Sequence, residues 1–458
     1  MEVSRRHLLT GALALGGASY AAGAVAGEPG ATGLVHVERA SRDHRGPLMS
    51  RARAMDVLEA ANLDALVVAH PISILHATGF DVPLLPVQVA RDHGVYAIVP
   101  RDPRRRVILV MPSFWYYWAY ANLHDETQVK VYQYTHPADN NSILATGQPV
   151  PEAEYMFPDM QQEPMDEMER QRAEFVAREA KARPVTSSLK FSLERALKDE
   201  ALADKRLGVE DYGDARNATF VAETVPGARI LPAAEECARI RMVKSDAEIR
   251  YMRHAARANA EAALAACQAV RAGASYRDLR ATFYREAAVR GNQGLWLIVD
   301  RMSSDLFDAD FRDGQAFLID AVSSYFGYFG DYGRTVFVGE PSKHMKRHTA
   351  AIAHAWEAIA EQLKPGVTFD DIRRIGSEAV SKGGFDTPVR FTPHSIGLIH
   401  TDALRLGNIT LEEGMVISVD CPVMGAGIGG SAHLEDLALI TSAGCEIIND
   451  TGDQTIVV

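Results

Sequence analysis

From residue 51 onward, the chain alternates between hydrophobic patterns typical of helices and of buried strands. Residues 51–61 place apolar side chains at helical spacing and predict an amphipathic helix. Short, nearly continuous apolar runs predict buried strands at Leu63–His70, Gly94–Val99, Arg106–Met111 and Leu207–Asp211. Helices that alternate with strands in this way indicate a small α/β domain.

A second domain is predicted to start near Arg241. Ser245 is a good helix N-cap, because its side chain can accept a hydrogen bond from the amide of Glu248. The Ala/Glu/Arg-rich stretch that follows predicts a helix to about Val270. Residues 148–172 show no periodicity and predict an insertion loop in the first domain.

The first feature that indicates chemistry is an acidic hairpin. Residues 316–320 form an apolar strand pattern that ends in Asp320. A segment rich in Gly, Tyr and Ser, 323–330, predicts a turn-rich loop, after which come Asp331 and a second strand over 334–339. A lone carboxylate in an apolar strand is strongly disfavoured, so these acids need a compensating partner.

A second hairpin repeats this design. An apolar strand over 415–420 ends in Asp420, residues 425–430 predict the turn, and the return strand runs over 433–440. Antiparallel partners keep a constant sum of residue numbers, so a turn centred near 427–428 sets Asp420 opposite Glu435.

Two hairpins that each bring carboxylates together favour a metal site, because facing like charges are destabilising unless a cation lies between them. The alternative is that the acids pair with Arg312, Arg334 or Arg390. His394 lies between the hairpins, and we interpret it as a ligand rather than a core residue. An oxygen-rich set with one imidazole suits Mn, Co, Fe or Zn.

The N-terminus has the pattern of an export signal. Arg5 and Arg6 follow Ser4, and a mildly apolar stretch of Ala, Gly and Leu ends in Ala-Val-Ala at residue 26. This is typical of a signal peptide, and the paired arginines indicate twin-arginine export to the periplasm or beyond. We expect cleavage after residue 26 without stable membrane insertion, and a flexible lead-in over 27–48; an uncleaved anchor is the alternative.

Composition excludes several other classes of protein. With a net charge of −12 and no basic tract, the chain is a poor candidate for binding nucleic acid. Its four cysteines lack the spacing of a structural zinc site or a disulfide scaffold. Beyond the N-terminus, no segment is apolar enough over a sufficient length to span a bilayer.

Taken together, these features resemble the pita-bread metallopeptidase family, which includes aminopeptidase P, prolidase, methionine aminopeptidase and creatinase. The similarity covers nearly the whole chain from about residue 50, with matching segments at 72–80, 241–249, 363–366 and 411–415. It implies an α/β (α+β) fold with a creatinase-type α/β domain, residues 49–240, before a pita-bread catalytic domain, residues 241–458. It also implies a homodimer.

The resemblance implies two divalent metal ions, of Mn, Co, Zn or Fe. The positions that match the five metal ligands of the family are Asp320, Asp331, His394, Asp420 and Glu435. In that arrangement Asp331 and Glu435 bridge the ions, and a water between the ions attacks an amide carbonyl. Asp420 relays the proton, and His400 or His433 stabilises the oxyanion.

Several positions depart from the pattern of the family. Asp420 stands where the ligand is usually Glu, which shortens the side chain by ~1.5 Å, about one C–C bond. Near Ser303 the peptidases carry a substrate-contacting His, which this chain lacks. The segment that ends at His400 is one residue shorter than in the family. His433 replaces a common Arg, and Gly333 replaces a frequent Thr.

The expected activity is that of an Xaa-Pro peptidase or prolidase-like hydrolase, acting on a small peptide or an N-acyl amino acid. One alternative is a metal-dependent lyase of the dimethylsulfoniopropionate-lyase type. That enzyme carries an additional Asp where this chain has Val322, which weakens the match. The other alternative is a non-catalytic relative that keeps the fold and a metal.

Overall fold

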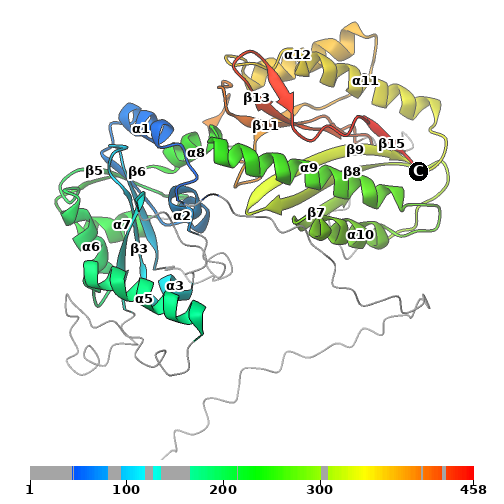
Figure 1. Cartoon of the computed structure of the whole chain (residues 1–458). Coiled ribbons are helices and arrows are strands. Elements are labelled where there is room, and N and C mark those ends of the chain that lie inside the picture. The colour runs from blue at the N-terminus through cyan, green and yellow to red at the C-terminus, as the bar shows by residue number, and fades with distance from the viewer. Residues whose placement is uncertain are drawn as a thin grey trace, which may run out of the picture. The chain divides into compact units, whose positions relative to one another are not determined.

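Helices and strands alternate through the first part of the chain, as the hydrophobic pattern predicts. The structure is a computed structural model that describes residues 44, 46–80, 94–118, 127–135, 166–213, 215–300, 308–403, 406–424 and 430–458. The first elements are α1 (Arg51–Ala60), β1 (Ala65–Val68), α2 (Pro71–Thr78), β2 (Tyr96–Pro100), β3 (Val107–Pro112), α3 (Ser113–Trp118), β4 (Val129–Tyr134), α5 (Glu167–Ala182), α6 (Leu189–Asp199), β5 (Arg206–Val209), α7 (Arg216–Thr224), β6 (Arg229–Pro232) and α8 (Ala234–Met242) (Figure 1). The predicted helix and all four predicted strands are confirmed, with ends that differ by a few residues.

These six strands form one sheet in the order β4-β3-β2-β1-β5-β6. Alternate residues of its strands enter two separate apolar clusters. Leu66 and Val68 of β1 pack with helices α1, α2 and α8, whereas Ala65 and Val67 pack with α6 and α7. Burial on both faces explains why the strands read as continuous apolar runs rather than as alternating patterns.

The predicted insertion loop over 148–172 is wrong at its C-terminal end. Residues 167–172 belong to α5, a helix rich in Glu and Arg. Its surface carries ion pairs one turn apart, such as Arg170 with Glu167 and Arg172 with Glu169. Helices supported by such pairs lack a strong hydrophobic period, which is why periodicity alone misses this one. Residues 148–165 lie outside the described residues, as do the predicted signal peptide and most of the lead-in.

The second set of elements forms two sheets. They are α9 (Asp246–Gln268), α10 (Tyr276–Val289), β7 (Gln293–Val299), β8 (Ala316–Tyr325), β9 (Tyr328–Phe337), α11 (Lys343–Ala360), α12 (Phe369–Lys382), β10 (Thr392–Ser395), β11 (Val416–Asp420), β12 (Leu434–Glu435), β13 (Leu437–Ile440), β14 (Cys445–Ile447) and β15 (Thr455–Val457). One sheet has the order β12-β9-β8-β7, with β15 beside β9, and the other has the order β10-β11-β13-β14. The predicted start of α9 is confirmed, since Ser245 and Glu248 form a capping box.

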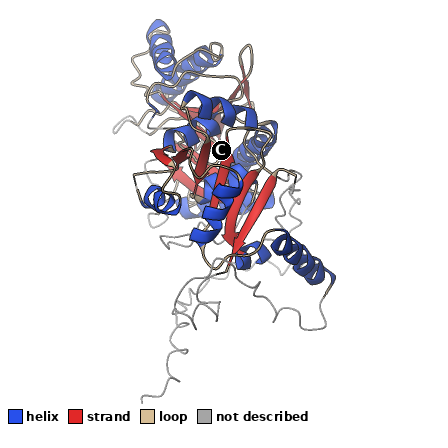
Figure 2. Ribbon diagram, turned by 90° about the vertical axis from the view of Figure 1, so that its left-hand side faces the viewer, coloured by secondary structure: helices blue, strands red, loops and turns tan. Residues whose placement is uncertain are grey.

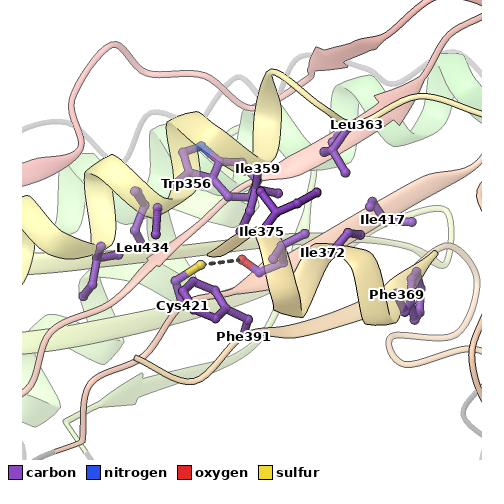
Figure 3. Packing of buried hydrophobic residues seen from close by; sticks show 14 of the residues in the cluster. Trp356, Ile359, Leu363, Phe369, Ile372, Ile375, Phe391, Ile417, Cys421 and Leu434 are labelled. Carbon is purple, nitrogen blue, oxygen red and sulfur yellow. Dashed lines mark hydrogen bonds between the residues drawn. The ribbon is translucent and has the colours of Figure 1, made fainter. Parts of the chain in front are cut away.

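Each of these sheets is covered by a helix pair, and the strands lie between the helices (Figures 1 and 2). Helices α9 and α10 pack on β7, β8 and β9 through a cluster that includes Phe283 and Phe317. Helices α11 and α12 pack on β11 and β13. Figure 3 shows Trp356, Ile359 and Ile372 of these helices gathered around Ile417 and Cys421. Among the described residues, no helix is both long enough and apolar enough to cross a bilayer.

The first acidic hairpin is tighter than predicted. The β8–β9 ladder continues to Tyr325 and Tyr328, so the connection is the two-residue turn of Phe326 and Gly327. Both turn residues have positive φ values, 47° and 82°, which match the twist of a short hairpin. The turn-rich loop predicted over 323–330 is therefore wrong. Its small residues belong to strands that pack closely on α9, where a Cβ at Gly330 would lie 2.4 Å from the carbonyl oxygen of Ala255.

The second acidic hairpin has the predicted register but a broken return strand. The pairs Val416 with Leu439 and Val423 with Ala432 share the register that sets Asp420 opposite Glu435. The return segment, however, is not one strand. β12 pairs with β9, whereas β13 pairs with β11, so the chain passes from one sheet to the other at residue 436. Residues 425–429 of the predicted turn lie outside the described part of the chain.

Candidate metal centre

The first hairpin presents its two acids on one face of a sheet. In the β8–β9 ladder Asp320 pairs with Gly333, and Val322 pairs with Asp331. Cross-strand partners share a face, and so do residues two apart on a strand. Asp320 and Asp331 are therefore diagonal neighbours, with Gly333 beside them on the same face.

The second hairpin brings Glu435 to the same place. Glu435 also pairs with Gly333, from the opposite side to Asp320, so the two acids flank this glycine. Glu435 is fully buried, and its Oε1 atom accepts a hydrogen bond from the Ser418 hydroxyl. Because the chain changes sheets at the next residue, Glu435 lies where the two sheets meet and faces acids of both hairpins.

His394 completes the cluster. It lies on β10, which pairs with β11 so that Thr392 is opposite Asp420. The Nε2 atom of His394 lies 3.7 Å from one carboxylate oxygen of each of its three acidic neighbours, which are Asp331, Asp420 and Glu435. The structure therefore brings together all five residues that the sequence singles out as ligands.

The donor set fits a divalent cation. Both carboxylate oxygens of Asp331 are buried and form no hydrogen bond within the described residues, although Nε2 of His400 lies 2.8 Å from Oδ2. Two groups, each with ligand atoms within 4.8 Å of one another, share Glu435: Asp320 with His433 and Glu435, and Asp331 with His394 and Glu435. Oxygen and imidazole donors at such distances suit Mn, Co, Fe or Zn.

Pairing with arginine does not explain these acids. Within the described residues, no ion pair joins Arg312, Arg334 or Arg390 to any of the four carboxylates. Arg334 is buried, but its Nη2 atom lies 2.8 Å from Oδ1 of Asp436, the residue after Glu435. Its other donors bind carbonyl oxygens of residues 333, 435 and 453. Arg334 thus joins β9 to β12 beside the cluster and does not act as a counter-charge to its four acids.

The electrostatics of the cluster agree with a cation site. Burial and the charge of Glu435 raise the pKa of Asp320 to about 7, and they raise the pKa values of Asp331 and Asp420 well above the ordinary value. Burial would also raise the pKa of Glu435, but contacts with two histidines hold it well below its usual range. Neighbouring acids that oppose one another's ionisation are stabilised together by a cation.

His400 and His433, the two histidines considered for catalysis, occupy different environments. His400 lies against Trp296 and Phe329, its Nε2 atom is 2.8 Å from Oδ2 of Asp331, and 24% of its side chain is exposed. Burial and the neighbouring His394 lower the pKa of His400 to about 4. His433 is only 3% exposed. Burial would lower its pKa, but its hydrogen bond to Glu435 and the nearby carboxylate charges raise it to about 9.

Two positioning residues were not expected from the sequence. Ser418 precedes Asp420 by two positions on β11, and this period-2 spacing is a signal that could have identified it. Asn449 lies in a loop and has no such signal. Its side chain donates to the carbonyl oxygen of Asp331 and accepts from the amide of Leu437, which ties the two hairpins together. The position near Ser303, where the family carries a His, lies outside the described residues.

Comparison with known proteins agrees with this geometry. Residues 250–442 match the model of metallopeptidase family M24. The chain is 25% identical over 300 residues to a probable dipeptidase PepE of Mycobacterium tuberculosis, covering 57% of this chain and 80% of that protein. It is also 25% identical over 229 residues to an Xaa-Pro dipeptidase of Pyrococcus horikoshii, covering 47% and 65%.

Solved structures show the same fold. A prolidase from Pyrococcus horikoshii aligns with a TM-score of 0.61 at 17% identity, over 88% of this chain and 98% of that chain. An X-Pro aminopeptidase from Thermotoga maritima aligns with a TM-score of 0.61 at 18% identity, over 89% and 99%. The fold is therefore that of the pita-bread enzymes, and the chain is an enzyme of the metallopeptidase class. Through residues 250–442 it is similar to metallopeptidase family M24.

Proposed function

We propose that the protein is a dinuclear metallohydrolase that cleaves the amide bond of a small peptide, such as an Xaa-Pro dipeptide, or of an N-acyl amino acid. The observation that carries this proposal is the buried carboxylate of Asp331, surrounded by three further carboxylates and His394. The names of the relatives, probable dipeptidase and Xaa-Pro dipeptidase, support the choice of substrate class.

In this proposal, Asp320, Asp331, His394, Asp420 and Glu435 would hold two divalent ions, and Glu435 is common to both groups of ligand atoms. Bound divalent ions would polarise the scissile carbonyl and lower the pKa of an attacking water. The five side chains converge from two sheets whose backbones are fixed by extensive ladders, which favours a preorganised site.

Two partly exposed side chains are suited to act on the substrate. Asp420 is 24% exposed, and in this proposal its carboxylate would accept the proton of the attacking water and pass it to the leaving amine. His400 has a lowered pKa, so it is neutral at pH 7 and can donate an N–H to the developing oxyanion. The burial of His433 does not suit the oxyanion role first considered for that residue.

No observation favours lyase chemistry over hydrolysis. Val322, at the position where the lyase carries a carboxylate, is a fully buried aliphatic residue that pairs with Asp331. Twin-arginine export, the homodimer and the division of the chain near residue 241 rest on the sequence alone and stay predictions.

A substrate panel with metal control tests this function. The purified protein, stripped with chelator and then supplied with Mn²⁺ or Co²⁺, is assayed against Xaa-Pro dipeptides, other dipeptides, N-acyl amino acids and a sulfonium substrate. We expect amide cleavage only in the metal-supplied protein. Asp313→Asn, which alters an exposed acid outside the cluster, is the matched control and should keep activity. Elimination from the sulfonium substrate without any amide cleavage would contradict the proposal.

A further inference from the structure

The imidazole of His433 lies inside the acidic cluster rather than beside it. Its Nε2 atom is 3.1 Å from Oε2 of Glu435 and 3.7 Å from Oδ1 of Asp420. Ligand atoms of His433, Asp320 and Glu435 all lie within 4.8 Å of one another. Donors bound to one ion at about 2.0–2.2 Å are at most about 4.4 Å apart, so a shift of a few tenths of an ångström would place the three around one ion.

The space for this ring is provided by Gly333. A Cβ atom at this position would lie 2.2 Å from Cδ2 and 2.3 Å from Nε2 of His433, and 2.8 Å from Cβ of Glu435. Gly333 pairs with Asp320 on one side and with Glu435 on the other. The ring of His433 therefore lies over the one position of β9 that separates these two acids, and any larger residue there would displace it.

The backbone of His433 is fixed by a single side chain. The amide of His433 donates to the hydroxyl of Thr335, at 2.9 Å, and the same hydroxyl donates to the carbonyl oxygen of His433, at 3.1 Å. The Nδ1 atom of His433 is buried and has no hydrogen-bond partner in the described part of the chain. The polar contacts of the ring are thus all made by Nε2 and are all with carboxylates of the cluster.

We propose that His433 is a ligand of the ion held by Asp320 and Glu435, and that Gly333 is required because it leaves room for this imidazole. The inference rests on the metal centre of the proposed function. It makes the two ion positions similar in composition, since each then has one imidazole: His433 at one and His394 at the other. His433 thereby acts on the ion and not on the substrate.

Paramagnetic NMR of the wild-type protein loaded with Co²⁺ tests this assignment without any variant. An imidazole bound to Co²⁺ gives a strongly shifted, solvent-exchangeable N–H signal. We expect two such signals at full loading, one from His433 and one from His394. A fully loaded wild-type protein with a single shifted imidazole signal would overturn the assignment while leaving the proposed function intact.

Metal titration of variants tests the role of the His433 imidazole separately from the role of the space that Gly333 leaves for it. Bound metal is counted by elemental analysis, and affinity is measured by calorimetry with Mn²⁺ or Co²⁺. His433→Ala should weaken one of two ions by at least ~10-fold and leave the other unchanged. Gly333→Ala should weaken the same ion although the imidazole is still present. His354→Ala is the control, because it removes an exposed imidazole outside the cluster.

The results of these titrations distinguish a failure of the His433 assignment from a failure of the proposed function. Circular dichroism and thermal unfolding first establish that each variant is folded. If folded His433→Ala binds both ions with wild-type affinity, the assignment of His433 is wrong and the dinuclear centre stands. If the wild-type protein binds no divalent metal at all, the proposed function fails as well.

Discussion

The two acidic hairpins look alike in the sequence and are built differently in the structure. In the first, β8 and β9 form one uninterrupted ladder joined by a two-residue turn, and both acids project from a single sheet. In the second, the return segment divides at residue 436 between two sheets, so Asp420 and Glu435 belong to different sheets although their register sets them opposite each other. A regular hairpin places charges on one face, whereas a divided one carries a charge to the boundary between sheets, where donors from both can surround one ion.

The largest effect should come from removing the acid at the centre of this arrangement. Asp331→Asn keeps the shape of the side chain but removes one of the charges that would hold the metal. We expect loss of bound metal and at least a ~10⁴-fold fall in kcat/KM, which corresponds to about 5 kcal/mol. Elemental analysis and steady-state kinetics measure these two changes. An Asp331→Asn protein that keeps two ions and near-wild-type kcat/KM would show that the first hairpin is not part of the site.

The buried pair of Arg334 and Asp436, whose side chains are 2% and 7% exposed, lies at the residue where the second hairpin divides. Arg334→Met leaves Asp436 as an uncompensated buried acid and should lower the free energy of unfolding by about 3–5 kcal/mol in urea titrations.

The double variant Arg334→Met with Asp436→Leu should recover much of this loss, since no isolated charge remains. Arg257→Met, which breaks an exposed pair with Glu261, is the control and should change stability by less than about 0.5 kcal/mol. Equal effects of Arg334→Met and Arg257→Met would mean that the buried pair does not hold the strands at the sheet boundary.

The features of the fold and site that the sequence predicts are those whose physical cause is local in the chain. The apolar strands, the five converging residues and the register of Asp420 with Glu435 follow from periodicity, chain order and a constant index sum. The switch at Asp436 does not, because it requires Arg334 from a strand that lies 102 residues away in sequence. The turn at Phe326 was missed because a non-glycine residue with positive φ has no strong sequence signal. The role of Gly333 depends on the ring of His433, which precedes β12 and lies over this glycine.

In metal-free protein the charge of Asp331 should destabilise the fold, so Asp331→Asn should raise the free energy of unfolding. Burial and neighbouring acids raise the pKa of Asp331, so between its ordinary pKa and this raised value the folded state binds more protons than the unfolded state. The free energy of unfolding of chelator-treated wild-type protein should therefore fall as pH rises through that window.

Asp331→Asn lacks this proton and should be more stable than the wild type in chelator, by about 1–3 kcal/mol at the upper end of the window. Urea unfolding at several pH values measures the difference. A metal-free Asp331→Asn protein that is less stable than the wild type at every pH would show that the Asp331 carboxylate has a stabilising partner of its own.

The smallest effect concerns the tight turn of the first hairpin. Gly327 has a φ of 82°, and a Cβ there would lie 3.3 Å from Cδ2 of Leu398. Gly327→Ala should cost about 1 kcal/mol in unfolding free energy, because an L-residue is strained in this conformation. Gly444→Ala, at a glycine whose φ lies outside the strained range and where a Cβ would meet only the carbonyl oxygen of Leu363 at 3.9 Å, is the control. A neutral Gly327→Ala would favour the looser loop that the sequence predicts.

Anomalous diffraction from crystals grown with Mn²⁺ tests the central claim most directly. The account predicts two peaks of anomalous density that share Glu435, one beside Asp320 and the other beside Asp331 and His394. Fully occupied Mn²⁺ bound elsewhere, with no density between the two hairpins, would contradict the claim that they meet to form a dinuclear metal centre.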